Sequence, residues 1–484
     1  MKLKILRYQA IPHSPSLQGA ETAKRIQYGL LALLVLSPLP VASVNEWSIL
    51  IIELALFAMA GIYILAKDRP AVNPRLEERL KWPRYAVLAL FAFLAVQILP
   101  LPAFVVRILS PGTYAFHEAF APGFTNTKYL SLSVVPAETF RESLELAAYV
   151  LAGFLVIRTV TRGREIRRII ACLVAVGAFE AFYGLLELAS KNPRLLFYKK
   201  VYSLGSVTGT FVNRSHLAGY LEMIVPLALG LLIARLDFFS LGGEGLRDRL
   251  IHMTGKGLPA NLLLFGSIIL MSLGIVFSQS RAGIFVLAFT FLLFFESVIL
   301  HFSRFGRRRK WLRNFLWITF ALITISALYI GVGSTIQRFS VDNLLREGRP
   351  LLWANVLRII SAFPVLGTGL GTFVSVYPAY EKIAGPELRL VHAHNDYLEY
   401  LSELGVIGFA FLLGVVLFLG ISALVAWRQR RNPEVKGIAL GGIISISVIL
   451  VHSLTDFNLH IPANMLLFAV VLSLTFVTAF YRKA

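Results

Sequence analysis

The stretch "HAHNDYLEYLSELGVIG", residues 392–408, places two histidines, an asparagine and three carboxylates at the start of an apolar run. The run continues through "FAFLLGVVLFLGISALVAW", residues 409–427. About twenty apolar residues in a helix are enough to cross the hydrocarbon core of a bilayer. Ionisable groups are costly inside lipid, so those at the head of this run must face protein or water. The stretch therefore predicts a membrane helix whose polar end has a specific purpose.

Similar apolar runs recur along the whole chain of 484 residues, of which 57% are hydrophobic and 15% charged. Backbone groups in lipid must be satisfied within their own segment, so we expect these runs to be helices. Their continuous apolar character differs from the alternating pattern of an outer-membrane barrel. The sequence predicts an all-α polytopic membrane protein with residues 1–484 forming a single integral membrane domain. We expect about 12 transmembrane helices, at 27–45, 47–66, 85–104, 142–158, 169–189, 216–235, 260–278, 282–301, 313–331, 396–425, 437–455 and 463–481.

The net charge of +20 is distributed in a way that indicates membrane orientation rather than nucleic-acid binding. With both termini in the cytoplasm, every short loop on the inner side is basic, as in "SRFGRRRK" and "RQRRNPEVK". This arrangement follows the rule that cytoplasmic loops carry the excess of Lys and Arg. The basic loops also attract an anionic lipid bilayer. We therefore expect the bilayer, and no nucleic acid, as the partner that explains the charge.

The same topology places three substantial loops outside, at about 105–141, 190–215 and 332–395. The third, a large loop of nearly sixty residues between the ninth and tenth spans, is of a length that is usually functional. Polar side chains concentrate on these outer turns and could converge on one extracytoplasmic site. They include Asn213, Arg214 and His216 in "GTFVNRSHLAGYLE", Arg281 in "FSQSRAG", and His452 and Asp456 in "HSLTDFNLHIPAN".

Inside the large loop, apolar residues from Leu352 to Phe363 recur at helical spacing and predict a short amphipathic helix. Asn355 and Arg358 lie off its apolar face. The helix is too short to span a membrane; it either lines an entrance for a lipid-linked molecule or packs on the bundle. The glycines of "GTGLGTF", residues 367–373, follow no strand, so we expect a tight turn there rather than a dinucleotide-binding motif.

Three readings of the opening stretch stay open from the residues alone. Asn395 or His394 can cap the tenth span, with Asp396 and Glu399 in its first turn near the positive end of the helix dipole. Together with Glu403 these acids share one face, which must look into a protein cavity. The cluster could instead do chemistry, or bind zinc through His392, His394 and other histidines.

Several motifs resemble those of the O-antigen ligase family. His394-Asn395, nine further residues and then Gly405-x-x-Gly408 resemble its signature, although Phe409 stands where the signature has Thr. "SQSRAG" resembles the Ser-Arg turn that opens the family's C-terminal core. "GRPLLWANVLRIISAFPVLGTGLGTF" resembles its Arg-x-x-x-Trp…Pro-x-x-Gly-x-Gly segment. The resemblance covers residues 260–425, and Wzy-type O-antigen polymerases share this core.

The resemblance implies a C-type glycosyltransferase (GT-C) fold and a periplasmic active site in the bacterial inner membrane. It implies transfer of a glycan from an undecaprenyl-diphosphate-linked donor to a hydroxyl acceptor, with no metal and no cofactor. For a ligase the acceptor is lipid A–core; for a polymerase it is another lipid-linked glycan. Carried over by position, His394 matches the family's catalytic histidine, while Arg281 and Arg349 match its two functional arginines. Arg346 competes with Arg349 for the second role.

These residue types suit the implied chemistry. A histidine with a pKa near neutrality can accept the proton of an attacking hydroxyl. Arginine is permanently charged and grips phosphate oxygens with two parallel hydrogen bonds, so it can stabilise a departing diphosphate. We expect a further group of residues to contact substrate: Asn213, Arg214, His216, Arg346, His392, Asn395, His452 and Asp456. His452 and Asp456, one turn apart, could orient one another.

A transporter or flippase for lipid-linked sugars is the alternative from another class. Such proteins usually carry repeated halves and polar residues near the bilayer midplane. Here the polar residues gather at the outer ends of the spans, which favours chemistry at the surface. The motifs leave ligase and polymerase both open, with the ligase preferred.

Overall fold

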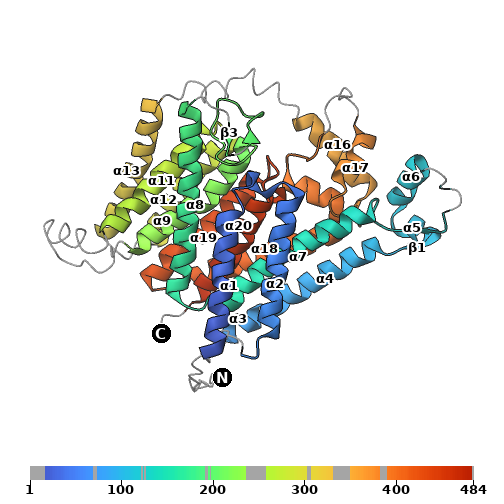
Figure 1. The fold of residues 1–484 in the computed structure, drawn as a ribbon, viewed down its shortest axis with the longest axis horizontal. Coiled ribbons are helices and arrows are strands. Elements are labelled where there is room, and N and C mark those ends of the chain that lie inside the picture. The colour runs from blue at the N-terminus through green and yellow to red at the C-terminus, as the bar shows by residue number, and fades with distance from the viewer. Residues whose placement is uncertain are drawn as a thin grey trace.

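The computed structural model describes residues 17–68, 74–121, 124, 127–190, 194–196, 198–235, 258–301, 307–330, 349–381 and 390–481. Helices dominate it (Figure 1). Each of the twelve expected runs falls on a helix. The twelve helices are α1 (Leu17–Leu36), α2 (Glu46–Leu65), α4 (Lys81–Ile98), α7 (Pro136–Thr159), α8 (Gly163–Ser190), α9 (Arg214–Arg235), α11 (Leu258–Phe277), α12 (Arg281–His301), α13 (Arg307–Ile330), α18 (Asp396–Arg428), α19 (Pro433–His452) and α20 (Pro462–Phe480).

Eight of these helices are long and apolar enough to cross a membrane, within the described residues. They are α2, α8, α9, α11, α12, α18, α19 and α20. The expectation of an all-α polytopic membrane protein is therefore confirmed. The number of twelve spans stays a prediction, because α1, α4, α7 and α13 are helical but are not among the helices that meet the combined criterion of length and apolarity.

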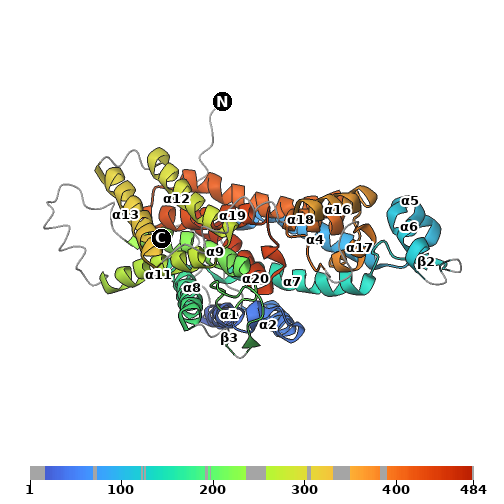
Figure 2. The same ribbon diagram turned by 90° about the horizontal axis from the view of Figure 1, so that it is seen from above.

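The centre of the bundle is built from α9, α19 and α20, whose apolar windows are 94%, 78% and 83% buried, against 22% for α18. A helix that is apolar all round is typical of a fully enclosed position. Close contact between α9 and α19 depends on small residues, as in other membrane helix pairs. A Cβ added at Gly441 would collide with the backbone of α9 at Pro226 and Gly230. α1 and α2 lie against one side of this centre (Figure 2).

Short elements cover one end of the bundle and extend from it. α16 (Arg349–Ala362) and α17 (Phe373–Tyr380) lie at the end opposite to the start of α1 (Figure 1). α5 (Ala103–Leu109), α6 (Pro111–Phe120) and the β1–β2 pair project sideways (Figure 2). The remaining short elements are α3 (Pro74–Arg79), η1 (Val41–Ser43), η4 (Asn458–His460), β1 (Leu101–Pro102), β2 (Tyr129–Leu130), β3 (Arg194–Leu195) and β4 (Tyr198–Lys199), with β1–β2 and β3–β4 antiparallel.

The predicted amphipathic helix is present as α16. Its apolar residues Leu352, Val356 and Ile359 are buried in one cluster with residues of α17. Asn355, which lay off the expected apolar face, is buried as well. Its amide donates to the Tyr377 hydroxyl at 3.2 Å, so this polar group is satisfied inside the protein. The helix thus packs on its neighbours, and its first residue, Arg349, reaches a cavity described below.

α18 is broken in its amino-terminal part, where Gly405 adopts φ +59° and ψ −176°. This conformation is open almost only to glycine. The amides of Val406 and Ile407, which the break releases, donate to the carbonyls of Pro364 and Val365. The turn that follows Val365 has positive φ at Gly367, Gly369 and Gly371, as the tight-turn interpretation predicted. A broken membrane helix is tolerated where protein satisfies its backbone in this way.

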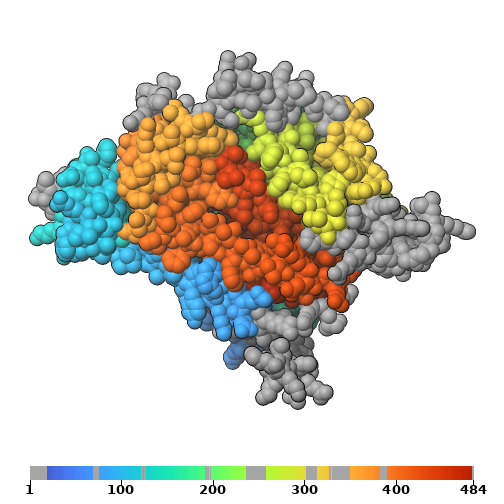
Figure 3. Space-filling view, turned by 180° about the vertical axis from the view of Figure 1, so that it is seen from behind, coloured from blue at the N-terminus to red at the C-terminus, as the bar shows by residue number. Residues whose placement is uncertain are grey.

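From behind, the orange surface of α16–α18 and the yellow-green surface of α11 and α12 flank a red strip from the C-terminal part of the chain (Figure 3). α18 and α12 are thus the outer walls of this face, while the central helices lie deeper. The turns that form the candidate site lie at the amino ends of α9, α12 and α18 and after the carboxyl end of α19.

Candidate active site

The "HAHND" segment is positioned by the cap of α18. The Asn395 side chain accepts a hydrogen bond from the Leu398 amide at 3.1 Å and donates to the Leu454 carbonyl at 2.8 Å. The Asp396 amide donates to the Ser453 carbonyl at 3.0 Å. His394 adopts φ +49°, in the left-handed region that histidine tolerates better than most residues. The cap predicted at Asn395 or His394 is therefore made by Asn395, and it fixes His394 against the turn between α19 and η4.

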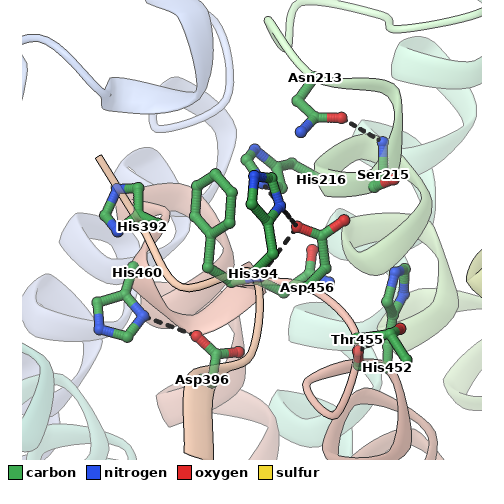
Figure 4. A network of polar contacts seen from close by, with 12 residues as sticks. Asn213, Ser215, His216, His392, His394, Asp396, His452, Thr455, Asp456 and His460 are labelled. Atoms are coloured by element: carbon green, nitrogen blue, oxygen red, sulfur yellow. Dashed lines mark hydrogen bonds and ion pairs between the residues drawn. The ribbon is translucent and has the colours of Figure 1, made fainter. Parts of the chain in front are cut away.

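Asp456 is the centre of a polar network in that turn (Figure 4). Its Oδ1 lies 3.3 Å from His394 Nδ1 and 3.7 Å from His216 Nε2, and its Oδ2 lies 3.7 Å from Arg349 Nη2. Burial by itself would raise the pKa of Asp456, but its contacts with His216 and His394 and the charge of Arg349 outweigh burial. The pKa of Asp456 is held well below its usual range, so the group is an anion at neutral pH.

Three imidazole rings surround the ring of Phe457. His392 stacks on it at 4.2 Å between centroids, while His216 and His394 meet it edge-on at 4.5 and 4.8 Å. Packing on an aromatic ring fixes the planes of the three histidines, which come from separate parts of the sequence. Phe457 lies in "HSLTDFNLHIPAN" with no periodic pattern to mark it, and sequence reasoning missed it.

Arg349 and Trp353 join α16 to the same network. Arg349 Nη1 donates to the Thr455 carbonyl at 2.7 Å, and Trp353 Nε1 donates to the Ala393 carbonyl at 3.1 Å. The two bonds place the first turn of α16 beside both the "HAHND" segment and the turn between α19 and η4. The spacing Arg-x-x-x-Trp thus has a physical reason, because both side chains must project from one face of a helix.

Arg349, His394 and Asp456 line one cavity of about 780 Å³, which we call the basic cavity. Of the expected site residues, it brings together Asn213, Arg214, His216, Arg281, Arg349, His392, His394 and Asp456. Among the described residues, three arginines and one carboxylate line it. A pocket of this size accommodates a small ligand or the head of a larger one.

Each of the three arginines is the first residue of its helix. Arg214 begins α9, Arg281 begins α12 and Arg349 begins α16. Asn213, the residue before α9, accepts from the Ser215 amide at 2.9 Å, so it serves as a cap while also lining the cavity. The amino ends of helices carry positive partial charge and unpaired amides, which favour anions. The arrangement concentrates positive charge from side chains and helix ends on one space.

Two of the expected site residues that the structure describes, Asn395 and His452, do not line the basic cavity. Asn395 is occupied by the cap of α18. His452 lies within the bundle, where its Nδ1 is 2.9 Å from Glu222 Oε2 and both side chains are 0% exposed. Its partner is therefore Glu222, which sequence reasoning missed, rather than the expected Asp456. Arg346 lies outside the described residues, so its competition with Arg349 is not addressed by the geometry.

A second network lies beside the first. His392 Nδ1 is 2.7 Å from Glu399 Oε1, and His460 Nδ1 is 2.7 Å from Asp396 Oδ1. Burial would lower the pKa of His460, but Glu399 and Asp396 outweigh burial and raise it to about 10. His460 is consequently a cation at neutral pH. The face shared by Asp396, Glu399 and Glu403 does look into protein, as predicted, and all three are 2% exposed.

One group in the described part of the chain has the spacing of a metal site. Ligand atoms of His392, Glu399 and His460 lie within 4.8 Å of one another. Two of these residues are hydrogen-bonded to each other, and His460 is bonded to Asp396. The zinc interpretation of the opening stretch is thus confined to this trio, which does not include His394.

Comparison with known proteins identifies one family. Residues 266–413 match the family model described as O-antigen ligase. No curated protein matches the chain. The matched segment runs from α11 into α18 and contains Arg281, Arg349 and His394. It confirms the relation to the O-antigen ligase-related superfamily that the motifs indicated, and it supports an activity of the ligase or polymerase type. Asn213, His216 and Asp456 are contributed from outside the match.

Proposed function

We propose that the protein is a periplasmic-face glycosyltransferase that moves a glycan from an undecaprenyl-diphosphate-linked donor to a hydroxyl acceptor. The observation that carries the proposal is the basic cavity, where three arginines at helix starts face His394 and Asp456. The family match supports the reaction type. The charge of the cavity suits a diphosphate, and its histidine suits a proton transfer.

His394 is the proposed general base. Ionised Asp456 can only accept hydrogen bonds, so His394 donates from Nδ1 and keeps its lone pair on Nε2. As the acceptor oxygen attacks the anomeric carbon, its proton passes to Nε2 and a new glycosidic bond forms. The bond between the anomeric carbon and the diphosphate oxygen breaks, and the diphosphate takes the electron pair. Asp456 then stabilises the imidazolium, as acid–histidine pairs do elsewhere.

Arg281 and Arg349 are proposed to stabilise the leaving diphosphate. Its negative charge grows as the bond breaks, so fixed cations near it lower the energy of the transition state more than that of the bound donor. Arg349 is held by Thr455 and Asp456, which preorganises its guanidinium. Arg214 adds a third charge to the same space. With this arrangement the reaction needs no divalent metal.

An O-antigen ligase, with lipid A–core as acceptor, is the preferred form of the activity, and a Wzy-type polymerase is the second. A transporter of lipid-linked sugars is disfavoured because the histidines and arginines converge at the outer ends of helices rather than at mid-span. The expected orientation, with the termini in the cytoplasm and the site in the periplasm, belongs to the same proposal. It rests on the distribution of basic loops.

A deletion strain tests the proposal and separates its two forms. Loss of a ligase leaves long polymer on undecaprenyl diphosphate, whereas loss of a polymerase leaves single repeats on lipid A–core. Lipopolysaccharide gels with a lipid-linked glycan assay would show one pattern or the other. An unchanged profile of both pools would contradict both forms.

A further inference from the structure

A second cavity of about 330 Å³ adjoins the basic cavity, and carboxyl groups rather than arginines predominate in its lining. Carboxylates from three helices line it: Glu46 of α2, Glu142 and Glu145 of α7, and Glu399 and Glu403 of α18. The cationic side chains on its lining are Arg141 and, when protonated, the histidines His392 and His460. We call it the acidic cavity.

Glu403 has unused hydrogen-bonding capacity inside the acidic cavity. It is 2% exposed, and its Oε1 accepts from the Phe373 amide at 3.0 Å. Its Oε2 has no hydrogen-bond partner among the described residues. A buried carboxyl oxygen without a hydrogen-bond partner is costly, so the site is incomplete without a ligand that forms a hydrogen bond with it.

The size of the cavity and its aromatic walls indicate an organic ligand. A volume near 330 Å³ is far more than a metal ion and its water would occupy, and it lies in the range of small-molecule pockets. Tyr149 and Tyr400 line the cavity together with the carboxyl groups. Tyr149 already donates to Glu145 at 2.6 Å, and Tyr400 stacks on His460 at 4.3 Å. Apolar surface with several acceptors suits a ligand that carries many hydroxyl groups.

The two cavities share a wall. His392 lines both of them, as do Val44, Val391 and Ile461. His392 is held there by Glu399 on the acidic side and by stacking on Phe457 beside His394. A ligand in the acidic cavity therefore lies directly next to the proposed position of the donor diphosphate.

We infer that the acidic cavity binds the hydroxyl-bearing sugar of the acceptor, with its reactive hydroxyl directed toward the shared wall at His392. The inference rests on the proposed glycosyltransferase function. Carboxyl groups form hydrogen bonds with sugar hydroxyls, whereas the arginines of the basic cavity suit the diphosphate of the donor, so the two linings favour different substrates. Glu403 and Glu142 are positioning residues for the acceptor, while the proton still passes to His394.

The test measures acceptor and donor separately on the full-length protein in lipid nanodiscs. Transfer from an undecaprenyl-diphosphate-linked repeat is followed with extracted lipid A–core, and with a second lipid-linked repeat, as acceptor. Binding of undecaprenyl diphosphate is measured alongside. Glu403→Gln and Glu142→Gln should each raise the KM for the acceptor about tenfold, since a hydrogen bond between the carboxyl group and the acceptor is lost, while donor affinity is unchanged.

Glu138→Gln is the matched control, because Glu138 lies on α7 one turn from Glu142 and does not line the acidic cavity. It should leave the acceptor KM unchanged. Arg281→Gln should show the reverse pattern, with weaker binding of undecaprenyl diphosphate and an unchanged acceptor KM.

An unchanged acceptor KM in both glutamate variants would overturn the inference, as would a loss of donor affinity in them equal to that in Arg281→Gln. One equivalent of tightly bound divalent metal that is lost in Glu399→Gln would also overturn it, since the carboxylates would then be metal ligands. If the unaltered protein transfers nothing to either acceptor, the proposed function itself fails.

Discussion

The basic and acidic cavities lie side by side, share His392, and are built differently. Arginines at the first positions of three helices face the basic cavity, so side-chain charge and helix dipoles add together there. Carboxyl groups from the amino-terminal parts of α7 and α18, and from Glu46 of α2, line the acidic cavity, where His460 lies beside Glu399. The difference indicates that one space is made for an anion and the other for a neutral, hydroxyl-rich group.

The largest effect is expected when His394, the proposed base in the basic cavity, is replaced. Asparagine tolerates the left-handed φ of this position but cannot act as a base, so His394→Asn should lower kcat by at least about a hundredfold. A single-turnover transfer assay with the protein in nanodiscs measures this rate. A matched variant is His117→Asn, since His117 of α6 lines neither cavity, and its rate should not change. Full activity in His394→Asn would show that another group accepts the proton.

Removal of charge from the same cavity should have the next largest effect. Arg281→Gln and Arg349→Gln should each lower kcat/KM for the donor about a hundredfold, because the lost interaction is strongest as the diphosphate departs. Lysine at either position should recover only part of the loss, since it keeps the charge but not the fork of donors. Equal activity of the lysine and glutamine variants would exclude charge stabilisation by these arginines.

Asp456 offers a finer test, because it acts through His394 rather than on substrate. Asp456→Asn should lower kcat roughly tenfold or more and leave the donor KM nearly unchanged. The pKa of Asp456 is lowered on folding, so its ionised form stabilises the protein above the ordinary pKa, near 4, and that stability is lost as pH falls through the lower folded value. Melting curves at pH 3 to 6 should therefore depend less steeply on pH in Asp456→Asn. Identical slopes would argue against an anionic Asp456.

The smallest effect should appear on the acidic side, as a change in stability with pH. Folding raises the pKa of His460 to about 10 from an ordinary value near 6.5. The stabilisation by protonated His460 is complete below pH 6.5 and is lost as pH rises through 10. His460→Gln should thus melt a few degrees lower at pH 6 and approach the unaltered protein near pH 10. A constant difference across this range would mean that His460 is not charged in the folded protein.

Elements with strong local signals could be predicted from the sequence. The Asn395 cap, the amphipathic helix α16 and the glycine turn all follow from the preferences of neighbouring residues. The placement of Arg281, Arg349 and His394 around one cavity agrees with the expected convergence of outer turns, and the family match agrees with the motifs that suggested it.

Features that depend on packing between distant segments could not be predicted in the same way. Glu222 pairs with His452 across 230 positions of sequence, and nothing near either residue marks the pair. The acidic cavity brings Glu142 and Glu145 of α7 next to Glu399 and Glu403 of α18. The shared face of the α18 acids was predictable from helical spacing, whereas the acids that oppose it were not.

A cryo-electron microscopy structure with undecaprenyl diphosphate bound tests the central claim most directly. The account predicts the diphosphate in the basic cavity, in contact with Arg281 and Arg349, with its free end toward His394. A diphosphate bound in the acidic cavity, or outside both cavities, would contradict it.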